Sequence, residues 1–363
     1  MTKSVKNLEI VARRDASGHS SWDHILEREP SSLLFQSAKW TDLLMAYLPD
    51  VEDFSLLAFF DGQLVGALPF LVSGKGPLGR VANSSPYYGS HGGFIIESSL
   101  TGADADSVRN ALFVAWKEQS AALGLAGYTI VEPLEGAMQN QFWEKLDWDV
   151  LDQRTGFITP LADDNSRQNP EQAMMQRLHS KTRNMVRKGR KSVSDIKREE
   201  TGTAYQFLQK THEDNMNVMG GAAKEPRFFE LARKYLDTRT YLAYVDQEPV
   251  AGLFLVRHNK VLEYFTPAVK SEFRSTQALS ALIFQAMIDG VNEDILYWNW
   301  GGCWPSQTSL AQFKRRWGSK DKEYRYFVKL NQPLEDWQNL AAPGITKAYP
   351  YFYVLPFSML EQS

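Results

Sequence analysis

The chain contains two stretches in which apolar runs flank a short polar turn. Residues 55–72 read SLLAFFDGQLVGALPFLV, and residues 240–257 read TYLAYVDQEPVAGLFLVR. Apolar runs of this length around a turn predict β-hairpins. The pair Asp61-Gly62 strengthens the first assignment, because glycine tolerates the positive φ that tight hairpin turns require.

The two predicted hairpins resemble each other and have similar neighbours. Aligned without a gap, they share four identical residues: Ala58 and Ala243, Asp61 and Asp246, Val65 and Val250, and Leu68 and Leu253. A helical pattern and a strand-like run follow in each half, at residues 108–123 and 127–132, and at residues 276–289 and 295–300. Any α/β protein offers some such alignments by chance, but the shared order of elements favours an internal duplication.

The length of the chain, 363 residues, suits two domains. A polar stretch at residues 161–170, LADDNSRQNP, ends in Asn-Pro, which disfavours helix and fits a boundary. We therefore predict an N-terminal domain over residues 1–165, a C-terminal domain over residues 166–335 and a tail over residues 336–363. The glycines at 220 and 221 predict a loop within the second domain.

Composition and charge narrow the class of protein. The net charge of −3 gives no global attraction to nucleic acid, so any affinity for anions must be local. Cys303 is the single cysteine and cannot form an internal disulfide, which fits a reducing compartment. No apolar run is long enough to cross a membrane, so we expect a cytoplasmic protein. The histidines and the cysteine show no metal-ligand spacing, and we predict no metal.

One stretch, residues 172–193, combines helical periodicity with a dense cationic face. An apolar arc comprises Met175, Leu178, Thr182, Met185 and Val186. The rest of the surface carries Arg177, Lys181, Arg183, Asn184, Arg187, Lys188, Arg190 and Lys191. Arginine and lysine in this density suit phosphate groups. We predict an anion site on Lys181, Arg183, Asn184, Arg187 and Lys188, with a solvated surface helix as the alternative.

Two motifs together resemble a known family. The first is the basic stretch, in the form Leu178-x-x-Lys181-x-Arg183-Asn184-x-x-Arg187-Lys188. The second is YWNWGG at residues 297–302, followed about a dozen residues later by Phe313-Lys314-Arg315-Arg316-Trp317-Gly318. The combination is similar to the FemAB-like branch of the GNAT superfamily, which includes peptidoglycan bridge-forming aminoacyltransferases and related acyltransferases. The resemblance covers roughly residues 30–330.

The resemblance implies an α/β (α+β) fold of two tandem GNAT-like domains, each a mixed sheet flanked by helices. It also implies an acyl or aminoacyl donor, acyl-CoA or aminoacyl-tRNA, and no permanently bound cofactor. The stretch at residues 270–279, KSEFRSTQAL, lacks the glycines with which GNAT acetyltransferases bind the coenzyme A pyrophosphate. Ser275 or Thr276 is expected to cap the following helix and leave backbone N–H groups for an anion.

Amide formation from an activated donor needs a neutral amine, aligned reactants and a stabilised oxyanion. The resemblance makes Lys314 the electrostatic partner of the donor carbonyl or its leaving group; a surface lysine is the alternative. Glu263 and Tyr264 are candidates for taking the amine proton and donating to the leaving group. Since side chains alternate along a strand, only one of the two can face a cleft.

Further candidates would line the substrate site. Trp298, Asn299, Trp300 and Gly301 end a predicted strand, where ligands of open α/β sheets bind. The remaining candidates are His212, Arg315 and the aromatic, glycine-rich stretch that includes Tyr87, Tyr88, His91 and Gly92. A helix-surface pair with Glu213 is the alternative for His212, and a plain turn is the alternative for the glycine-rich stretch.

The favoured function is N-acyl or aminoacyl transfer to an amine of a cell-envelope or polysaccharide precursor. The alternatives are acyl-CoA-dependent acetylation of a small amine or amino sugar, and a non-catalytic module that binds phosphate-bearing ligands. Expected partners are acyl-CoA, aminoacyl-tRNA, or a nucleotide- or lipid-linked sugar. The aromatic tail, ITKAYPYFYVLPFSML at residues 345–360, is expected to pack on the body, with peripheral membrane contact as the alternative.

Overall fold

The computed structural model describes residues 7–16, 21–84, 91–133, 143 and 146–360. These residues form two compact units that interleave in sequence. The N-terminal unit comprises Met1–Glu29, Phe35–Arg154 and Glu323–Ser363, and the C-terminal unit comprises Pro30–Leu34 and Thr155–Lys322. The contiguous division at residues 165 and 335 differs from these units, because two long strands, β9 and β15, each contribute to both.

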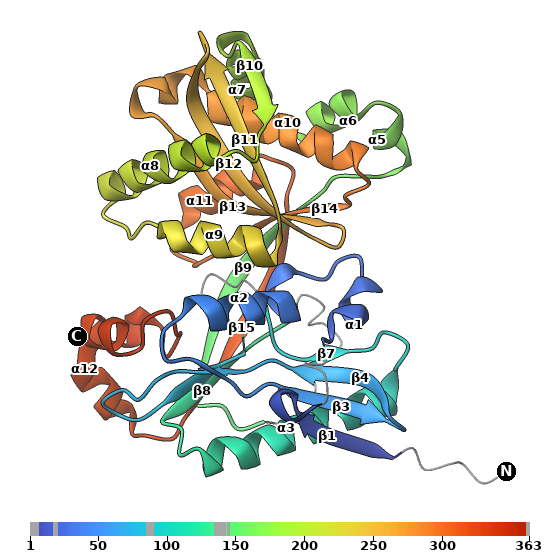
Figure 1. The fold of residues 1–363 in the computed structure, drawn as a ribbon, viewed down its shortest axis with the longest axis vertical. Coiled ribbons are helices and arrows are strands. Elements are labelled where there is room, and N and C mark those ends of the chain that lie inside the picture. The colour runs from blue at the N-terminus through green and yellow to red at the C-terminus, as the bar shows by residue number, and fades with distance from the viewer. Residues whose placement is uncertain (1–6, 17–20, 85–90, 134–142, 144–145, 361–363) are drawn as a thin grey trace, which may run out of the picture. The chain divides into compact units, whose positions relative to one another are not determined.

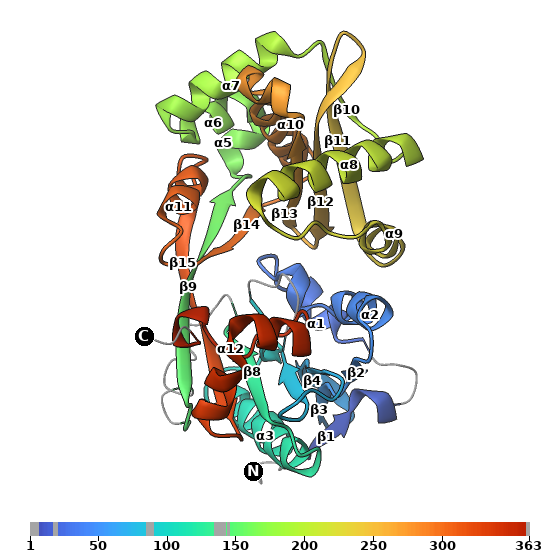
Figure 2. The same ribbon diagram turned by 90° about the vertical axis from the view of Figure 1, so that its left-hand side faces the viewer.

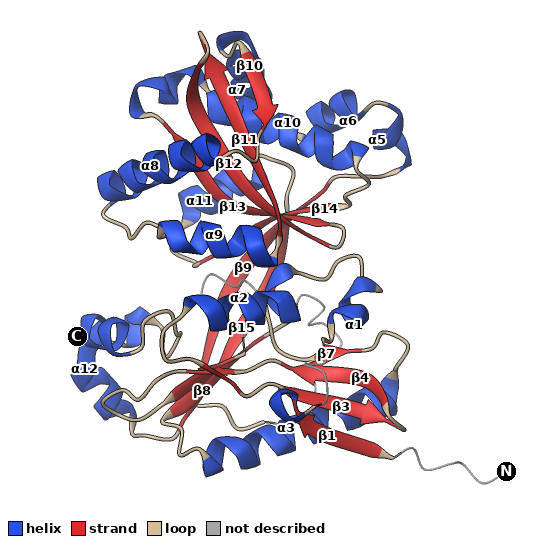
Figure 3. Cartoon of the chain, in the orientation of Figure 1, coloured by secondary structure: helices blue, strands red, loops and turns tan. Residues whose placement is uncertain are grey.

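The N-terminal unit has two sets of hydrogen-bonded strands. One has the order β1 (Leu8–Ala12), β3 (Leu56–Phe60), β4 (Gln63–Leu68) and β7 (Ile95–Ile96). The other has the order β15 (Lys320–Leu330), β8 (Gly127–Val131), β6 (Val81–Asn83), β5 (Leu71–Val72) and β2 (Glu52–Asp53). Its helices are α1 (Asp23–Glu27), α2 (Ala38–Tyr47), α3 (Gly102–Ala122) and α12 (Leu334–Ala348) (Figures 1 and 3).

The C-terminal unit has a mixed sheet between two helical layers. Its strands follow the order β10 (Asp195–Arg198), β11 (Asp237–Val245), β12 (Glu248–His258), β13 (Val261–Val269), β14 (Tyr297–Cys303) and β9 (Val150–Pro160). One face carries α8 (Gly202–Met219) and α9 (Pro226–Tyr235) (Figures 1 and 2). The other carries α6 (Pro170–Arg177), α7 (Ser180–Ser192) and α10 (Ala278–Asn292). Short helices α5 (Asp164–Gln168) and α11 (Thr308–Arg315) complete it.

Both predicted hairpins form, and they hold the same topological position. β3 and β4 pair next to β1, and β11 and β12 pair next to β10, all antiparallel. The ladder shifts register after Ala58 in the first hairpin and after Ala243 in the second, which are aligned residues. A helix and a further strand follow in both units, α3 and β8 in one, α10 and β14 in the other. The tandem arrangement expected from sequence is therefore confirmed.

The predicted basic helix over residues 172–193 is two helices. Leu178 and His179 are extended, with ψ of 143° and 149°, and they separate α6 from α7. The break places the buried Leu178 in the core, and the His179 ring accepts the backbone N–H of Lys181 at the start of α7. Of the predicted apolar arc, Leu178, Thr182 and Val186 are buried, whereas Met175 and Met185 are only half-buried. Met174 and Gly189, which the prediction did not include, are also buried.

The C-terminal tail packs on the N-terminal unit. Tyr349, Val354, Leu355 and Leu360 are buried in a cluster with Trp337 of α12 and with residues of β6 and β15. This is the first of the two arrangements expected for the tail. Among the described helices, none has the length and apolar character needed to cross a membrane.

Candidate functional site

The parallel strands β13 and β14 pair only at their beginnings. The ladder runs from Val261 with Tyr297 to Glu263 with Asn299 and then ends. Beyond it, β13 has an extra residue opposite β12, because the register moves from Thr266 to Tyr264. The β14 ladder with β9 is also irregular, between Asn299 and Gly302. The two strands therefore separate at their carboxyl ends, where open α/β sheets bind ligands.

Glu263 lies at the last pair of this ladder and is fully buried. Its carboxylate accepts the Asn299 side-chain amide at 2.7 Å and the backbone N–H of Leu34 at 3.4 Å. Burial raises the pKa of Glu263 to about 8, against the lowering effect of these two hydrogen bonds. A carboxyl with this pKa exchanges its proton near neutral pH, as a general base requires.

Glu263 and Tyr264 occupy opposite faces of the sheet. Leu262 packs in the core under α10, and Tyr264 packs against the same core. The Tyr264 ring lies 4.8 Å from the Trp300 ring and 6.0 Å from the Trp298 ring. Burial raises the pKa of the Tyr264 phenol, so it remains a proton donor at neutral pH. Glu263 therefore belongs to the face of α8 and α9, and Tyr264 to the face of α10.

The tryptophans of β14 form an apolar wall. Trp298 and Trp300 are buried, and the Trp300 indole N–H donates to the Thr159 hydroxyl at 2.9 Å. Between them, Asn299 uses both ends of its amide, because its oxygen also accepts the Gly301 N–H at 2.9 Å. The predicted residues of this strand thus divide into an apolar wall and a polar group that fixes Glu263.

Lys314 is buried under β14 and does not lie on the surface. Its ammonium donates to the carbonyls of Gly301 at 3.2 Å and Gly302 at 3.0 Å, where the β9 ladder is irregular. It also lies 5.3 Å from the centre of the Phe157 ring. Burial lowers the pKa of Lys314, and the interaction with Cys303 partly opposes this. The ammonium therefore supports the distorted end of β14, which begins two residues after Asn299, the residue that holds Glu263.

Helix α7 approaches the start of α10 very closely. A Cβ on Gly189 would lie 2.3 Å from the backbone oxygen of Gln277, so only glycine fits there. At the same end of α10, the Thr276 hydroxyl accepts the N–H of Ala278 at 3.2 Å, whereas the neighbouring Ser275 is exposed. Neither residue holds the N-cap position of α10, which is Gln277, although the Thr276 hydroxyl accepts the first N–H of the helix.

The cations of α7 divide into structural and exposed groups. Arg183 donates to the backbone oxygen of Leu178 at 2.6 Å, and Arg190 pairs with Glu171 of α6. Arg187, which lies 3.5 Å from the Asn184 side chain, is exposed. Three lysines of α7 are also exposed and have no ion pair within the described residues: Lys181, Lys188 and Lys191. These exposed cations form the candidate anion surface.

His212 is buried in α8 and so does not form the exposed pair with Glu213 that was the alternative. Its Nε2 atom accepts the backbone N–H of Lys224 at 3.3 Å. Burial, together with the Lys224 charge, lowers the pKa of His212 to about 4, so the ring is neutral and holds the start of α9. Lys224 itself, which sequence reasoning missed, lies 5.1 Å above the ring of Phe265 in the irregular part of β13.

The remaining candidates lie elsewhere. Arg315 is exposed, and its guanidinium forms a bidentate pair with Asp321. Tyr87 and Tyr88 fall outside the described residues. His91 and Gly92 are buried in the N-terminal unit, and burial lowers the pKa of His91 to about 3. Within the described part of the chain, no group of three or more potential metal ligands is present.

Residues 177–326 match the family described as the acetyltransferase (GNAT) domain. The match covers most of the C-terminal unit and supports an acyltransferase. No curated protein sequence matches the chain significantly.

Solved structures extend the likeness to both units. The fold is similar to FemX, with a TM-score of 0.69, 15% identity, and coverage of 91% of this chain and 99% of that one. It is also similar to the C-terminal domain of a putative lysylphosphatidylglycerol synthetase from Agrobacterium fabrum, with a TM-score of 0.55, 11% identity, and coverage of 92% and 99%. A tandem GNAT protein from the clavulanic acid biosynthesis pathway gives a TM-score of 0.50, 12% identity, and coverage of 90% and 99%. The resemblance to the FemAB-like branch of tandem GNAT proteins is thus confirmed in the fold.

Proposed function

We propose that the chain is a cytoplasmic enzyme that transfers an acyl or aminoacyl group to an amine of a cell-envelope or polysaccharide precursor. The observation that carries this proposal is Glu263, a buried carboxyl with a pKa of about 8 at the point where two parallel strands of a GNAT domain separate. The likeness of the whole fold to FemX favours transfer of an aminoacyl group over a non-catalytic binding role.

In the proposed reaction the amine nitrogen attacks the carbonyl carbon of the donor ester or thioester. Glu263 takes the proton that the amine must lose, and the donor alcohol or thiol leaves with a proton from solvent, because Tyr264 lies on the opposite face of the sheet. No covalent enzyme intermediate is needed, because both reactants are held together. Glu263 must be ionised to act, so its raised pKa places the rise in rate close to pH 8.

The role proposed for Lys314 follows from its hydrogen bonds. Its ammonium holds the carbonyls of Gly301 and Gly302, and the Gly301 N–H donates to Asn299, two residues earlier. We propose that it fixes the end of β14 and places positive charge close to the developing oxyanion. A fixed charge of this kind contributes a few kcal/mol, or ~10²–10³ in rate.

We propose two classes of donor, acyl-CoA and aminoacyl-tRNA, both of which carry phosphate groups. The match to the GNAT family favours acyl-CoA, and the likeness to FemX favours aminoacyl-tRNA. Either would place phosphates on the exposed cations of α7 near the start of α10. Arg187 and Lys188 are the central pair of that surface.

The experiment that tests the function combines binding with turnover. Native mass spectrometry of the chain with acetyl-CoA, aminoacyl-tRNA and UDP-linked amino sugars identifies the donor and the acceptor. Product formation from the pair that binds is then measured for the wild type, for Glu263→Gln and for Glu230→Gln, an exposed glutamate on α9. Loss of turnover in the first variant alone supports the proposal. Full turnover in Glu263→Gln would remove the base from the mechanism, and binding without turnover in the wild type would favour the non-catalytic module.

A further inference from the structure

The strand junction of the N-terminal unit corresponds residue by residue to the candidate site. β6 and β8 are parallel and pair from Val81 with Gly127 to Asn83 with Thr129. The third pair of this ladder therefore corresponds to Glu263 and Asn299, the third pair in the C-terminal unit. All four side chains are buried. Both units thus place two polar side chains inside the sheet at the same point.

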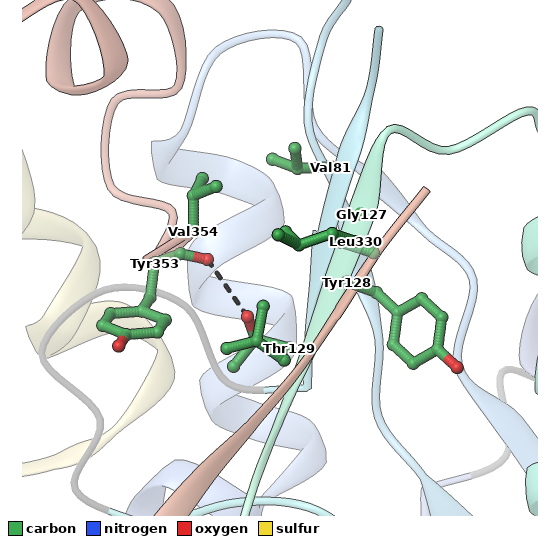
Figure 4. Close-up of a pocket in the computed structure, with 9 residues that line it drawn as sticks. Val81, Gly127, Tyr128, Thr129, Leu330, Tyr353 and Val354 are labelled. Carbon is green, nitrogen blue, oxygen red and sulfur yellow. Dashed lines mark hydrogen bonds between the residues drawn. The ribbon is translucent and has the colours of Figure 1, made fainter. Parts of the chain in front are cut away.

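In the N-terminal unit this polar pair holds the main chain of the tail. The Asn83 amide donates to the Tyr353 carbonyl at 2.8 Å, and its oxygen accepts the Tyr353 N–H at 2.7 Å. The Thr129 hydroxyl donates to the same carbonyl at 3.3 Å (Figure 4). One side chain therefore satisfies both polar groups of one residue, as a neighbouring strand does. These bonds of Asn83 and Thr129 therefore recognise the peptide backbone and do not depend on which side chain the bound residue carries.

The side chains of Tyr349, Tyr353 and Val354 make further contacts with the N-terminal unit. The Tyr349 hydroxyl accepts the Leu78 N–H and donates to the Gly79 carbonyl, both at 3.1 Å. The Tyr353 hydroxyl donates to Asp152 at 2.8 Å, and Val354 is one of the residues that line the narrow crevice at β6, β8 and β15 (Figure 4). Residues 349–352 form a turn with Tyr351 at a positive φ, so Tyr353 is the tail residue whose main chain these side chains hold.

We propose that the junction formed by Asn83 and Thr129 is a binding site for the backbone N–H and C=O of a peptide residue, and that its resident ligand is Tyr353 in the chain's own tail. The site takes a backbone N–H and C=O from one residue, with an aromatic residue at that position and an aliphatic residue after it. One consequence is that the tail occupies this junction and leaves the C-terminal unit as the single site of transfer. That consequence rests on the proposed function, whereas the docking of the tail does not.

Hydrogen exchange on the full-length chain tests the docking without reference to activity. Asn83→Leu removes both bonds to Tyr353 and keeps a side chain of similar size, so exchange in residues 350–356 should accelerate at least about tenfold. Thr129→Val should give about threefold, since it removes one bond. Thr346→Ala, whose hydroxyl bonds only to Ala342 within α12, is the matched control and should change nothing. Wild-type protection of the tail in a folded Asn83→Leu chain would overturn the proposal.

A peptide in trans tests the site itself and remains decisive if Asn83→Leu fails to fold. Tyr353→Pro removes the N–H that Asn83 accepts and should release the tail. A labelled peptide of residues 349–360 should then bind this variant and not the wild type, as read by fluorescence anisotropy. Adding Thr129→Val to the Tyr353→Pro chain should weaken that binding severalfold. Failure of the peptide to bind the Tyr353→Pro chain, or binding that Thr129→Val leaves unchanged, would refute a peptide site at this junction.

Discussion

Replacing Glu263 with glutamine should lower the free energy of unfolding at low pH and raise it at high pH. The folded-state pKa of Glu263 is about 8, and its ordinary value is 4.5. A carboxyl whose folded pKa is raised contributes its full stability below 4.5 and loses it progressively up to pH 8. At ~1.4 kcal/mol per pH unit, the loss is roughly 5 kcal/mol across that window. Glutamine does not titrate and shows none of this loss.

Against this gain, glutamine has one acceptor oxygen where Glu263 has two. Glu263 accepts both the Leu34 N–H and the Asn299 amide, so the variant loses one of these bonds, at a cost of about 1–1.5 kcal/mol. Glu263→Gln should therefore unfold more easily than the wild type at pH 5 and less easily at pH 9. Urea denaturation at pH 5, 7 and 9 measures the difference, with Glu230→Gln as the control that should follow the wild type throughout. A difference between Glu263→Gln and wild type that stays constant over this range would show that Glu263 titrates as an ordinary carboxyl.

The same variant links stability to catalysis. The ionised form of Glu263 is the base, so kcat/KM of the wild type should rise with pH and level off above about 8. Glu263→Gln should lower kcat by ~10²–10⁴ and remove this pH dependence, with little effect on donor binding. If the variant keeps the wild-type pH profile at lower rate, another group supplies the base and the proposed role of Glu263 is wrong.

Three further predictions concern the residues around this carboxyl. Lys314→Ala should lower kcat and kcat/KM together by ~10²-fold, with little change in donor Kd, and Lys314→Arg should recover part of the rate; an increase in KM alone would make Lys314 a binding residue. Tyr264→Phe keeps the ring against Trp300 and should leave kcat unchanged for both good and poor leaving groups, because the hydroxyl lies on the face of the sheet opposite Glu263; a fall of about tenfold in kcat would show that the hydroxyl protonates the leaving group. Replacing Arg187 and Lys188 with glutamine should weaken binding of the phosphate-bearing donor about tenfold at low salt and flatten its salt dependence, with Lys117→Gln on α3 as the control; unaltered binding would reduce this face of α7 to a solvated surface.

Local patterns were sufficient to predict the hairpins and the order of elements. The runs at residues 55–72 and 240–257 carry their own turn signals, and each forms the hairpin that the pattern indicates. The break at Leu178 and His179 was missed because helical periodicity and positive charge continue across it. Two extended residues between two helices do not interrupt such a pattern.

The candidate site depends on contacts that no local pattern contains. Glu263 and Asn299 were both singled out, but their pairing depends on the register of two parallel strands joined through α10. The N–H of Leu34 comes from a part of the chain more than two hundred residues away. Lys314 was recognised from its motif, whereas its burial against Gly301 and Gly302 follows from the irregular end of β14.

The duplicated junction indicates how the two units came to differ in chemistry. The third pair is Asn83 with Thr129 in one unit and Glu263 with Asn299 in the other. A neutral amide and a hydroxyl can only exchange hydrogen bonds, so they bind a peptide group, and Tyr353 supplies one. A carboxyl at the same buried position acquires a raised pKa and can accept a proton from a substrate near neutral pH. The difference between holding a peptide and accepting a proton therefore resides largely in the side chain at position 83 or 263, on a backbone that pairs in the same way in both units.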